Sequence, residues 1–115
     1  QVGPQSFEQM RLISSDLEKV QDKLGLLKEV GVTDIVKSSL VGGLLNKLGV
    51  GKVGIPIQAG KKGAELSYGY FLLNPKGQRD FRNFLKSLQS GNKKAVERYL
   101  KTMDKHALEE ESKTQ

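Results

Sequence analysis

The chain has 115 residues, of which 37% are hydrophobic and 28% charged, and it contains no cysteine. This size and composition predict one globular domain, residues 1–115, and they exclude a disulfide-stapled fold and a thiolate metal site. No apolar run approaches the roughly eighteen residues that a membrane-spanning helix requires. We therefore expect a cytoplasmic protein without cofactor or metal. A processed or secreted form stays open because the sequence begins at Gln1 rather than at a methionine.

The net charge of +6 is unevenly distributed along the chain. Residues 1–30 have a net charge of −1, residues 31–108 of +9, and residues 109–115 of −2. A concentrated basic surface favours phosphate-rich partners, with nucleic acid first and anionic membrane second. The alternative is a basic surface that only keeps the chain in solution.

The first helix is expected within residues 6–30. Ser6 followed by Gln9 has the spacing of a capping box, which places the helix start near Phe7. Apolar residues then recur at steps of three and four, the spacing of a coiled-coil seam: Met10, Ile13, Leu17, Val20, Leu24 and Leu27. This seam packs either on the domain core or on a second copy of the helix in a dimer. Gly25 lies within the seam and predicts an end or a bend there.

A second helical segment is expected over residues 33–48. Gly31 is a candidate C-cap for the first helix, and Thr33 is a candidate N-cap for the second. Gly42 and Gly43 weaken the segment and could split it, and Gly49 ends it. The apolar run over residues 40–55 with spaced lysines could also belong to a membrane-active amphipathic peptide, although core packing explains it more simply.

A central antiparallel β-hairpin is expected over residues 53–73. Apolar residues alternate on both sides of a glycine-flanked loop, as in two strands: Val53, Ile55 and Ile57 before it, and Leu66, Tyr68, Tyr70 and Leu72 after it. If the two strands pair about a turn at Lys61 and Lys62, one face of the hairpin is apolar and the other has small residues, among them Gly54 and Gly69. The sequence therefore predicts an α+β fold, mostly helical with one hairpin.

Two further helices are expected within residues 75–108. Asn74 and Pro75 are typical of a helix start, and the first helix should bury Phe81, Phe84, Leu85 and Leu88. Ser90 and Gly91 end it, and Asn92 caps the last helix, which should bury Ala95, Val96, Tyr99, Leu100 and Met103. Residues 109–115 have no apolar partner and are expected to fray.

The sequence shows no catalytic or metal-binding signature. His106 is the only histidine, and a histidine near a helix end is usually a surface residue. The acidic residues Asp16, Asp22, Asp34, Asp80 and Asp104 form no paired-carboxylate spacing. The glycines around residues 49–54 precede an expected strand, so they do not fit a phosphate-binding loop.

Two short motifs resemble winged-helix regulators of the MarR and PadR type over about residues 31–88. The run Tyr70–Phe71–Leu72–Leu73–Asn74–Pro75–Lys76–Gly77 is similar to their passage from wing to dimerisation helix, and Leu44–Leu45–Asn46–Lys47–Leu48–Gly49 resembles the end of their recognition helix. The resemblance implies a groove-facing helix with Lys37, Ser38, Ser39, Asn46 and Lys47, and a wing tip at Lys61 and Lys62. It implies DNA-binding and regulation of transcription.

From charge and resemblance together, the leading prediction is a nucleic-acid-binding protein, with duplex DNA as the expected partner. Phosphate contacts are expected mainly from Lys61, Lys62, Lys76 and Arg79. A homodimer through the terminal helices is possible, and neither a small-molecule ligand nor a membrane partner is indicated. The first alternative is a protein-interaction or assembly module. The further alternatives are a small basic nuclease or toxin that uses His106, and a membrane-active protein.

Overall fold

The computed structural model describes residues 4–57 and 61–113, and within these it leaves out the side chains of residues 4–6, 61–65 and 68. Every regular element in the described residues is helical. In chain order they are α1 (Pro4–Val20), the 3-10 helix η1 (Gln21–Lys23), α2 (Leu26–Val30), α3 (Val32–Ile35), α4 (Ser39–Leu48), the 3-10 helix η2 (Val50–Val53), α5 (Lys61–Leu73), α6 (Pro75–Ser90) and α7 (Lys93–Lys113).

The predicted α+β fold with a β-hairpin over residues 53–73 is wrong, because the described part of the chain contains no strand. Lys61 and Lys62 begin α5 instead of forming a turn, and their side chains lie outside the described residues. The wing expected of a winged-helix, DNA-binding transcription regulator is therefore missing from residues 4–57 and 61–113. The described residues therefore give no structural support for DNA binding by a winged-helix mode.

The second half of the predicted hairpin is helical because its buried positions follow the helix period. Ser67, Tyr70 and Phe71 are buried, whereas Leu66 and Leu73 are about half exposed. Burial at steps of three and one is the pattern of one helix face. The alternation of apolar residues therefore did not indicate a strand, because one of them, Leu66, lies on the solvent side of α5.

In the first half of the predicted hairpin, residues 53–57, buried and exposed side chains alternate as predicted, but the segment pairs with no strand in the described residues. Ile55 is buried, Val53 and Ile57 are partly buried against the core, and Gly54 and Pro56 between them are exposed. The segment leaves η2 through Gly54, whose φ of +85° is the left-handed conformation that favours glycine. Alternate side chains thus anchor a connecting segment on the core, and they do not require a sheet.

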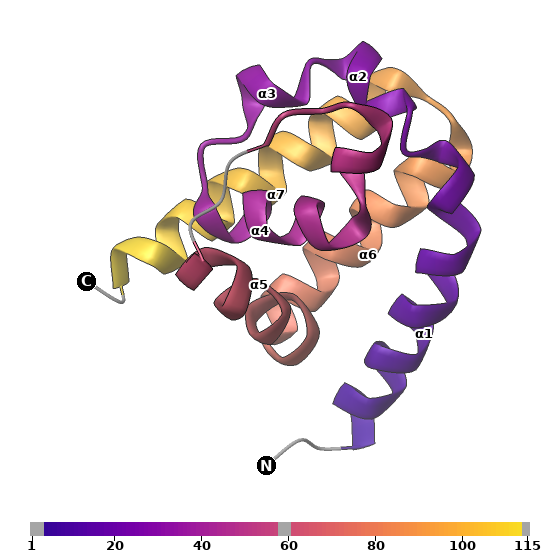
Figure 1. Cartoon of the computed structure of the whole chain (residues 1–115). Coiled ribbons are helices and arrows are strands. Elements are labelled where there is room, and N and C mark those ends of the chain that lie inside the picture. Colours follow the sequence, from indigo (N-terminus) through magenta and orange to yellow (C-terminus); the bar gives the residue numbers. More distant parts are fainter. Residues whose placement is uncertain (1–3, 58–60, 114–115) are drawn as a thin grey trace.

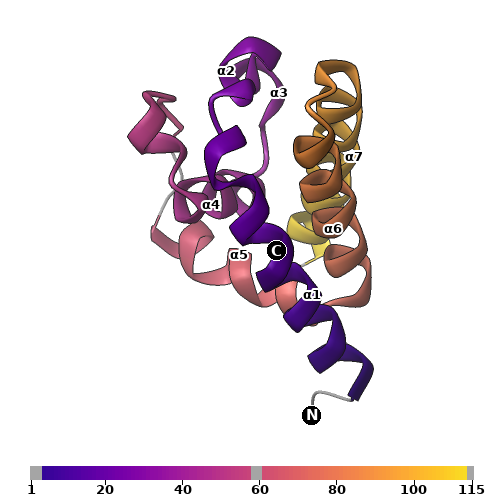
Figure 2. The ribbon, with the colours of Figure 1, turned by 90° about the vertical axis from the view of Figure 1, so that its right-hand side faces the viewer.

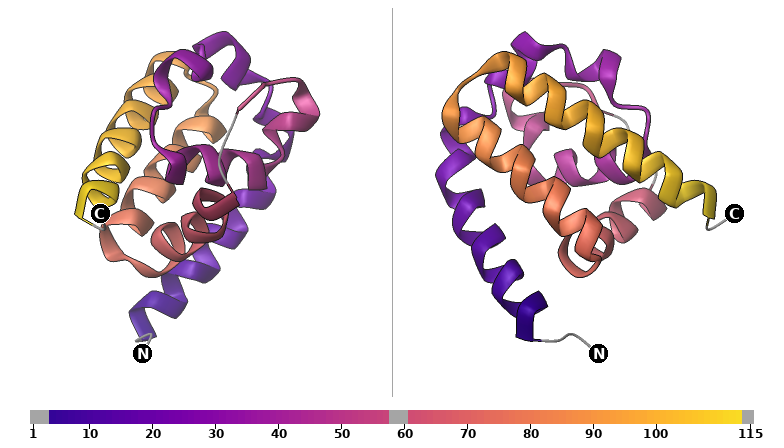
Figure 3. Two further views of the ribbon diagram at one scale, coloured as in Figure 1. Left: turned by 60° about the vertical axis from the view of Figure 1, so that its left-hand side comes forward. Right: turned by 180° about the vertical axis from the view of Figure 1, so that it is seen from behind.

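The helices form two groups around one core. α6 and α7 form an antiparallel hairpin, and α4 and α5 pack together beside it with α2 and α3 above (Figures 1 and 2). Helix α1 runs along α6, and its N-terminal end projects beyond the rest of the molecule (Figure 3). Helices α1 and α6 thus lie side by side along one edge of the molecule.

Helix α4 occupies the centre of the fold. It is buried at Leu40, Val41, Gly42, Gly43, Leu44, Leu45 and Leu48. A helix that is apolar around most of its surface belongs in a protein interior. The two glycines do not split it, since α4 is continuous from Ser39 to Leu48. The break comes earlier, at residues 36–38, between α3 and α4.

The predicted apolar seam of the first helix packs on the core of the same chain. Ile13, Val20, Leu24 and Leu27 are buried in it, and Leu17 packs against it. The seam spans three elements, because α1 already ends at Val20 and α2 begins after Gly25. Since these side chains are buried within one copy, the seam is not free for a helix pair between two copies.

Most predicted helix ends are confirmed. Gly31, Gly49 and Gly91 are C-caps with positive φ, and Asn74 Oδ1 accepts hydrogen bonds from the backbone N–H groups of Lys76 and Gly77. The predicted N-cap at Thr33 is wrong, because Gly31 directly precedes α3 and Thr33 lies within it. The side-chain cap belongs to Ser38, one helix later.

Helix α7 caps the central helix α4 from a distance in sequence. The Asp104 carboxylate accepts hydrogen bonds from the backbone N–H groups of Lys37 and Ser38, at 3.1 and 2.9 Å to Oδ1. Glu111 Oε1 accepts from the Leu40 N–H at 2.9 Å and from the Ser38 hydroxyl at 3.0 Å. Negative charge at a helix N-terminus is favourable, because it meets unpaired N–H groups and the positive end of the helix dipole.

The expectation of a frayed tail over residues 109–115 is therefore wrong as far as Lys113, where α7 ends. Glu111 has structural partners in residues 38 and 40, and these could not be recognised from the local sequence. Residues 114 and 115 lie outside the described part of the chain.

We expect the contribution of Asp104 to stability to fall as pH rises. Burial raises the pKa of the Asp104 carboxyl, and the nearby charge of Glu111 raises it further. The hydrogen bonds from the Ser38 and Lys37 N–H groups lower this pKa, but burial has the larger effect. The folded state therefore binds this proton more tightly than the unfolded state, whose value is close to 3.8. The part of the Asp104 contribution that is linked to this proton is complete below that value and is lost as pH rises through the folded pKa.

The measurement is urea unfolding of the wild type and the Asp104→Asn variant at pH 3.5 and pH 7. The difference in unfolding free energy between the two proteins should be larger at the lower pH, since only the wild type titrates at this position. A difference that is constant or grows with pH would contradict the expectation.

Candidate binding cleft between α1 and α6

Helix α6 has one apolar and one cationic side. Phe81, Phe84, Leu85 and Leu88 are fully buried, as the sequence predicts. The cations Arg79, Arg82 and Lys86 recur at steps of three and four on another side of the helix. We call these three residues the α6 cation row. Because the step matches the helix period, they form one line along the helix axis.

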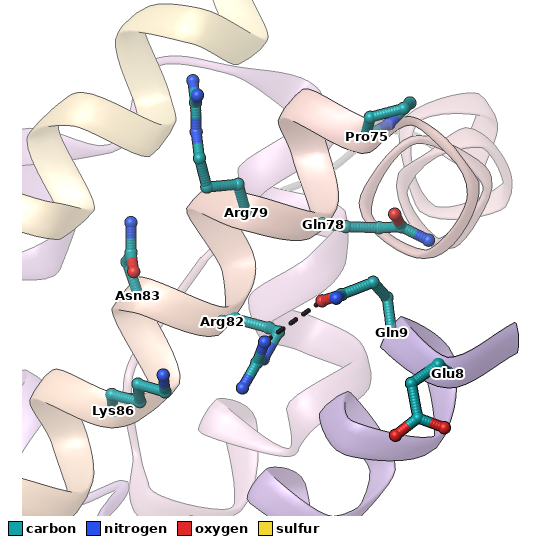
Figure 4. Close-up of a pocket in the computed structure, with 8 residues that line it drawn as sticks. All are labelled: Glu8, Gln9, Pro75, Gln78, Arg79, Arg82, Asn83 and Lys86. Atoms are coloured by element: carbon teal, nitrogen blue, oxygen red, sulfur yellow. Dashed lines mark hydrogen bonds between the residues drawn. The ribbon is translucent and has the colours of Figure 1, made fainter. Parts of the chain in front are cut away.

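The α6 cation row borders a cleft of about 560 Å³ between α1 and α6. The lining side chains are mostly polar: Glu8 and Gln9 from α1, and Pro75, Gln78, Arg79, Arg82, Asn83 and Lys86 from α6 (Figure 4). Figure 4 shows Arg82 pointing toward Gln9, whereas Arg79 and Asn83 point away from α1. The cleft thus combines guanidinium, ammonium and amide groups, which are donors to anionic oxygen atoms.

Arg82 is held in place from two sides. Its Nη1 donates a hydrogen bond to Gln9 Oε1 at 3.2 Å, and its Nε lies 3.8 Å from Asp16 Oδ2. The latter is an ion-pair distance and too long for a hydrogen bond, and neither of these two buried atoms has a hydrogen-bond partner in the described residues. Gln89 Nε2 donates to the other Asp16 oxygen at 3.2 Å. The guanidinium therefore has a fixed direction in the cleft.

The cleft has an excess of positive charge. Arg79 and Lys86 are exposed and have no carboxylate at ion-pair distance among the described residues. The one acidic side chain in the lining, Glu8, forms an ion pair with Arg11 at 2.5 Å. Arg79 and Lys86 are thus available to an anion from solution.

The residues of the expected groove-facing helix are dispersed around α4. Ser38 is buried as the N-cap, and its hydroxyl accepts from the Leu40 and Val41 N–H groups. Lys37 and Ser39 are exposed beside it, while Asn46 and Lys47 are exposed at the opposite end of the helix. Because the middle of α4 is buried, these residues form two separate ends and no continuous contact surface.

Of the other predicted phosphate contacts whose side chains the structure describes, Arg79 lies in the cleft and Lys76 does not. Lys76 is one turn earlier on α6, and its Nζ lies 3.6 Å from Glu109 Oε2. Lys61 and Lys62 start α5, and their side chains are outside the described residues. Arg82, Lys86 and Gln9 were not predicted as site residues. The three-and-four spacing of the cations on α6 is the signal that could have identified two of them.

His106 has a specific partner that the sequence did not reveal. Its Nδ1 lies 2.6 Å from Asp80 Oδ2, and this bond joins α7 to α6. The expectation of an ordinary surface histidine is therefore wrong, since the side chain is about one-fifth exposed and hydrogen-bonded to a buried carboxylate. The pair links two helices, and no serine or threonine hydroxyl or cysteine is hydrogen-bonded to it in the described residues.

Neither a metal centre nor a membrane span is found in the residues that the structure covers. No three His, Cys, Asp or Glu side chains in that part are grouped so that they could hold a metal ion. None of its helices combines the length and the apolar character needed to cross a membrane.

No protein-family model, curated protein sequence or solved structure matches this chain. The comparisons therefore neither support nor refute the resemblance to winged-helix regulators, and the functional argument depends on the residues of this chain.

Proposed function

We propose that the chain binds nucleic acid through the sugar–phosphate backbone, with the cleft between α1 and α6 as the contact site. The observation that supports this proposal most strongly is the α6 cation row beside amide side chains in a concave surface. Phosphate oxygens are acceptors for arginine, lysine and amide donors, and backbone contacts supply most of non-specific nucleic-acid affinity. The net charge of +6 gives such a partner a favourable long-range field.

The length of the cation row suits a chain of phosphates. Lys86 is seven positions after Arg79, which corresponds to about 10 Å at 1.5 Å per helical residue. Each strand of a duplex has one charge per about 3.4 Å of its axis, so the row faces about three phosphates of one strand. The fixed guanidinium of Arg82 lies between the two exposed cations and needs little reorganisation to bind an oxygen atom. This chemistry is shared by duplex DNA and single strands.

Reversal of both exposed cations should weaken this binding strongly. We expect the Arg79→Glu/Lys86→Glu variant to lose about tenfold or more in affinity for a 20-nucleotide single-stranded RNA and a 20-base-pair duplex at 50 mM salt. The slope of log affinity against log salt should fall by about 0.7 for each lost single-strand contact and by about 0.9 for each lost duplex contact. Fluorescence anisotropy over 50–200 mM salt measures both quantities.

The matched control is Lys28→Glu/Lys52→Glu, which changes the net charge by the same amount at two exposed lysines on α2 and η2. A loss confined to the α6 variant supports the cleft. An equal loss in both variants would assign binding to overall charge, and no binding by the wild type at 50 mM salt would disprove the proposal.

A cytoplasmic location accords with a nucleic-acid partner and is part of this proposal. Self-association through the terminal helices stays a prediction, and it would have to use surfaces other than the apolar seam that α1 and α2 bury in their own core.

A further inference from the structure

A second concave surface lies on the other side of the α5–α6 connection. It is a groove of about 530 Å³ between α5 and the C-terminal part of α7, with Leu40 and Tyr70 at its base. Leu40 and Tyr70 are each less than one-tenth exposed. Unlike the cleft between α1 and α6, this groove is lined mainly by apolar side chains.

Helix α5 has an exposed apolar stripe along the groove. Leu66, Gly69, Tyr70 and Leu73 all line it and follow the spacing i, i+3, i+4, i+7 of one helix face. Leu66 is 53% exposed and Leu73 47% exposed, and they are two of the four large hydrophobic side chains that the described residues leave in solvent. Two such leucines on one stripe are costly to leave in water, since burial of apolar surface is favourable.

Among the described side chains, the rim of the groove is acidic, in contrast to the chain as a whole. α7 contributes the carboxylates of Glu110 and Glu111 to the lining, and Glu109 precedes them in the sequence. Glu109 faces Lys76, and Glu111 binds residues of α4, whereas Glu110 lines the groove and has no ion-pair partner in the described residues. Burial raises the pKa of Tyr70 to about 12, and the charges of Asp80, Glu110 and Glu109 contribute in the same direction. The negative potential therefore reaches the base of the groove.

We propose that this groove binds a cationic amphipathic helix of a partner protein. The stripe on α5 extends about two turns, which suits a helix with apolar anchors at i, i+3 or i+4, and i+7. An acidic rim favours lysine or arginine on the flanks of that helix and disfavours an anionic membrane or a nucleic acid. Addition of a strand is not available, because the part of the chain that the structure describes has no sheet edge.

The test uses three synthetic 18-residue peptides and fluorescence anisotropy. One is a helix with leucines at i, i+3, i+4 and i+7 and lysines on the flanks, the second has glutamates in place of the lysines, and the third is a scrambled form of the first. The first peptide should bind, with affinity that falls as salt rises, and the other two should bind at least about tenfold more weakly.

Variants of the groove should remove this binding without unfolding the chain. We expect Leu66→Ser/Leu73→Ser to weaken it about tenfold and Glu110→Lys about threefold. The matched control is Phe7→Ser, which changes another exposed apolar side chain, 59% exposed on α1. Circular dichroism verifies that all variants keep their helical content, and urea unfolding provides an independent readout of intact structure.

Three outcomes would overturn the proposal. These are equal binding of the scrambled or glutamate peptide, unchanged binding by the double serine variant, and a dimer in sedimentation that the same variant dissociates. The last outcome would assign the groove to a second copy of this chain.

Discussion

The Gly77→Ala variant is expected to lose about 3 kcal/mol of unfolding free energy, because the added methyl group meets backbone. Gly77 is buried in the first turn of α6 where that helix crosses α5. A Cβ at this position would overlap the Tyr70 carbonyl oxygen and would lie 3.1 Å from Cε2 of the Tyr70 ring. The Tyr70 carbonyl lies in the last turn of α5 and accepts a hydrogen bond from the Asn74 N–H, so it cannot rotate away without breaking that bond, and the two helices must separate. Overpacking of this kind typically costs about 1–3 kcal/mol and sometimes more.

Gly69→Ala is the matched control on the partner helix. A Cβ there meets nothing within 4 Å, and Gly69 lies within α5. Alanine should therefore raise the unfolding free energy by about 0.5–1 kcal/mol, the usual difference between the two residues in a helix interior. Urea unfolding of both variants measures the contrast. A neutral Gly77→Ala would show that the two helices are not in this close contact.

The Asp104→Ala variant is expected to lose about 2–3 kcal/mol of unfolding free energy, because it removes one of the two α7 carboxylates that cap the start of the central helix. The Lys37 and Ser38 N–H groups both lose their acceptor, and Ser38 is buried. A buried donor without a partner costs about 1–3 kcal/mol. Asp104→Asn keeps one side-chain oxygen and should lose about half as much.

Hydrogen exchange distinguishes this local effect from a general loss of packing. The Ser38 amide should exchange faster in Asp104→Ala by more than amides in the middle of α6, such as that of Leu85. A uniform acceleration at both places would show that the carboxylate stabilises the whole fold and does not act as a cap.

Local signals in the sequence identified the helices of the C-terminal half. Asn74, Pro75 and Gly91 mark the ends of α6, and the buried stripe from Phe81 to Leu88 has the helix period. These signals are reliable because cap and stripe both act within a few residues. The segment from Val53 to Leu73 was misassigned because its apolar spacing fits a strand and a helix alike. Only the packing of Phe71 and Ser67 against other helices determines which periodicity is used.

The candidate sites depend on pairs that are distant in sequence. The charge excess and Arg79 pointed to α6, but the cleft exists because Arg82 faces Gln9, 73 residues earlier. Asp80 and His106 are 26 residues apart and gave no recognisable motif. A single sequence shows residue types and local spacing, and it contains no information on which helices become neighbours when several packings bury similar area.

The caps that α7 provides for α4 have a consequence for biosynthesis. Ser38 and Leu40 receive their partners from residues 66 to 73 positions later in the chain. Contacts of such separation require closure of a long loop before they stabilise anything, which slows folding. During translation the N-terminus of α4 therefore has only the Ser38 hydroxyl as a cap until residue 111 has left the ribosome. We expect nascent chains that stop before Asp104 to be less stable than the full chain, because α4 can already pack on α5 but lacks its contacts with α7.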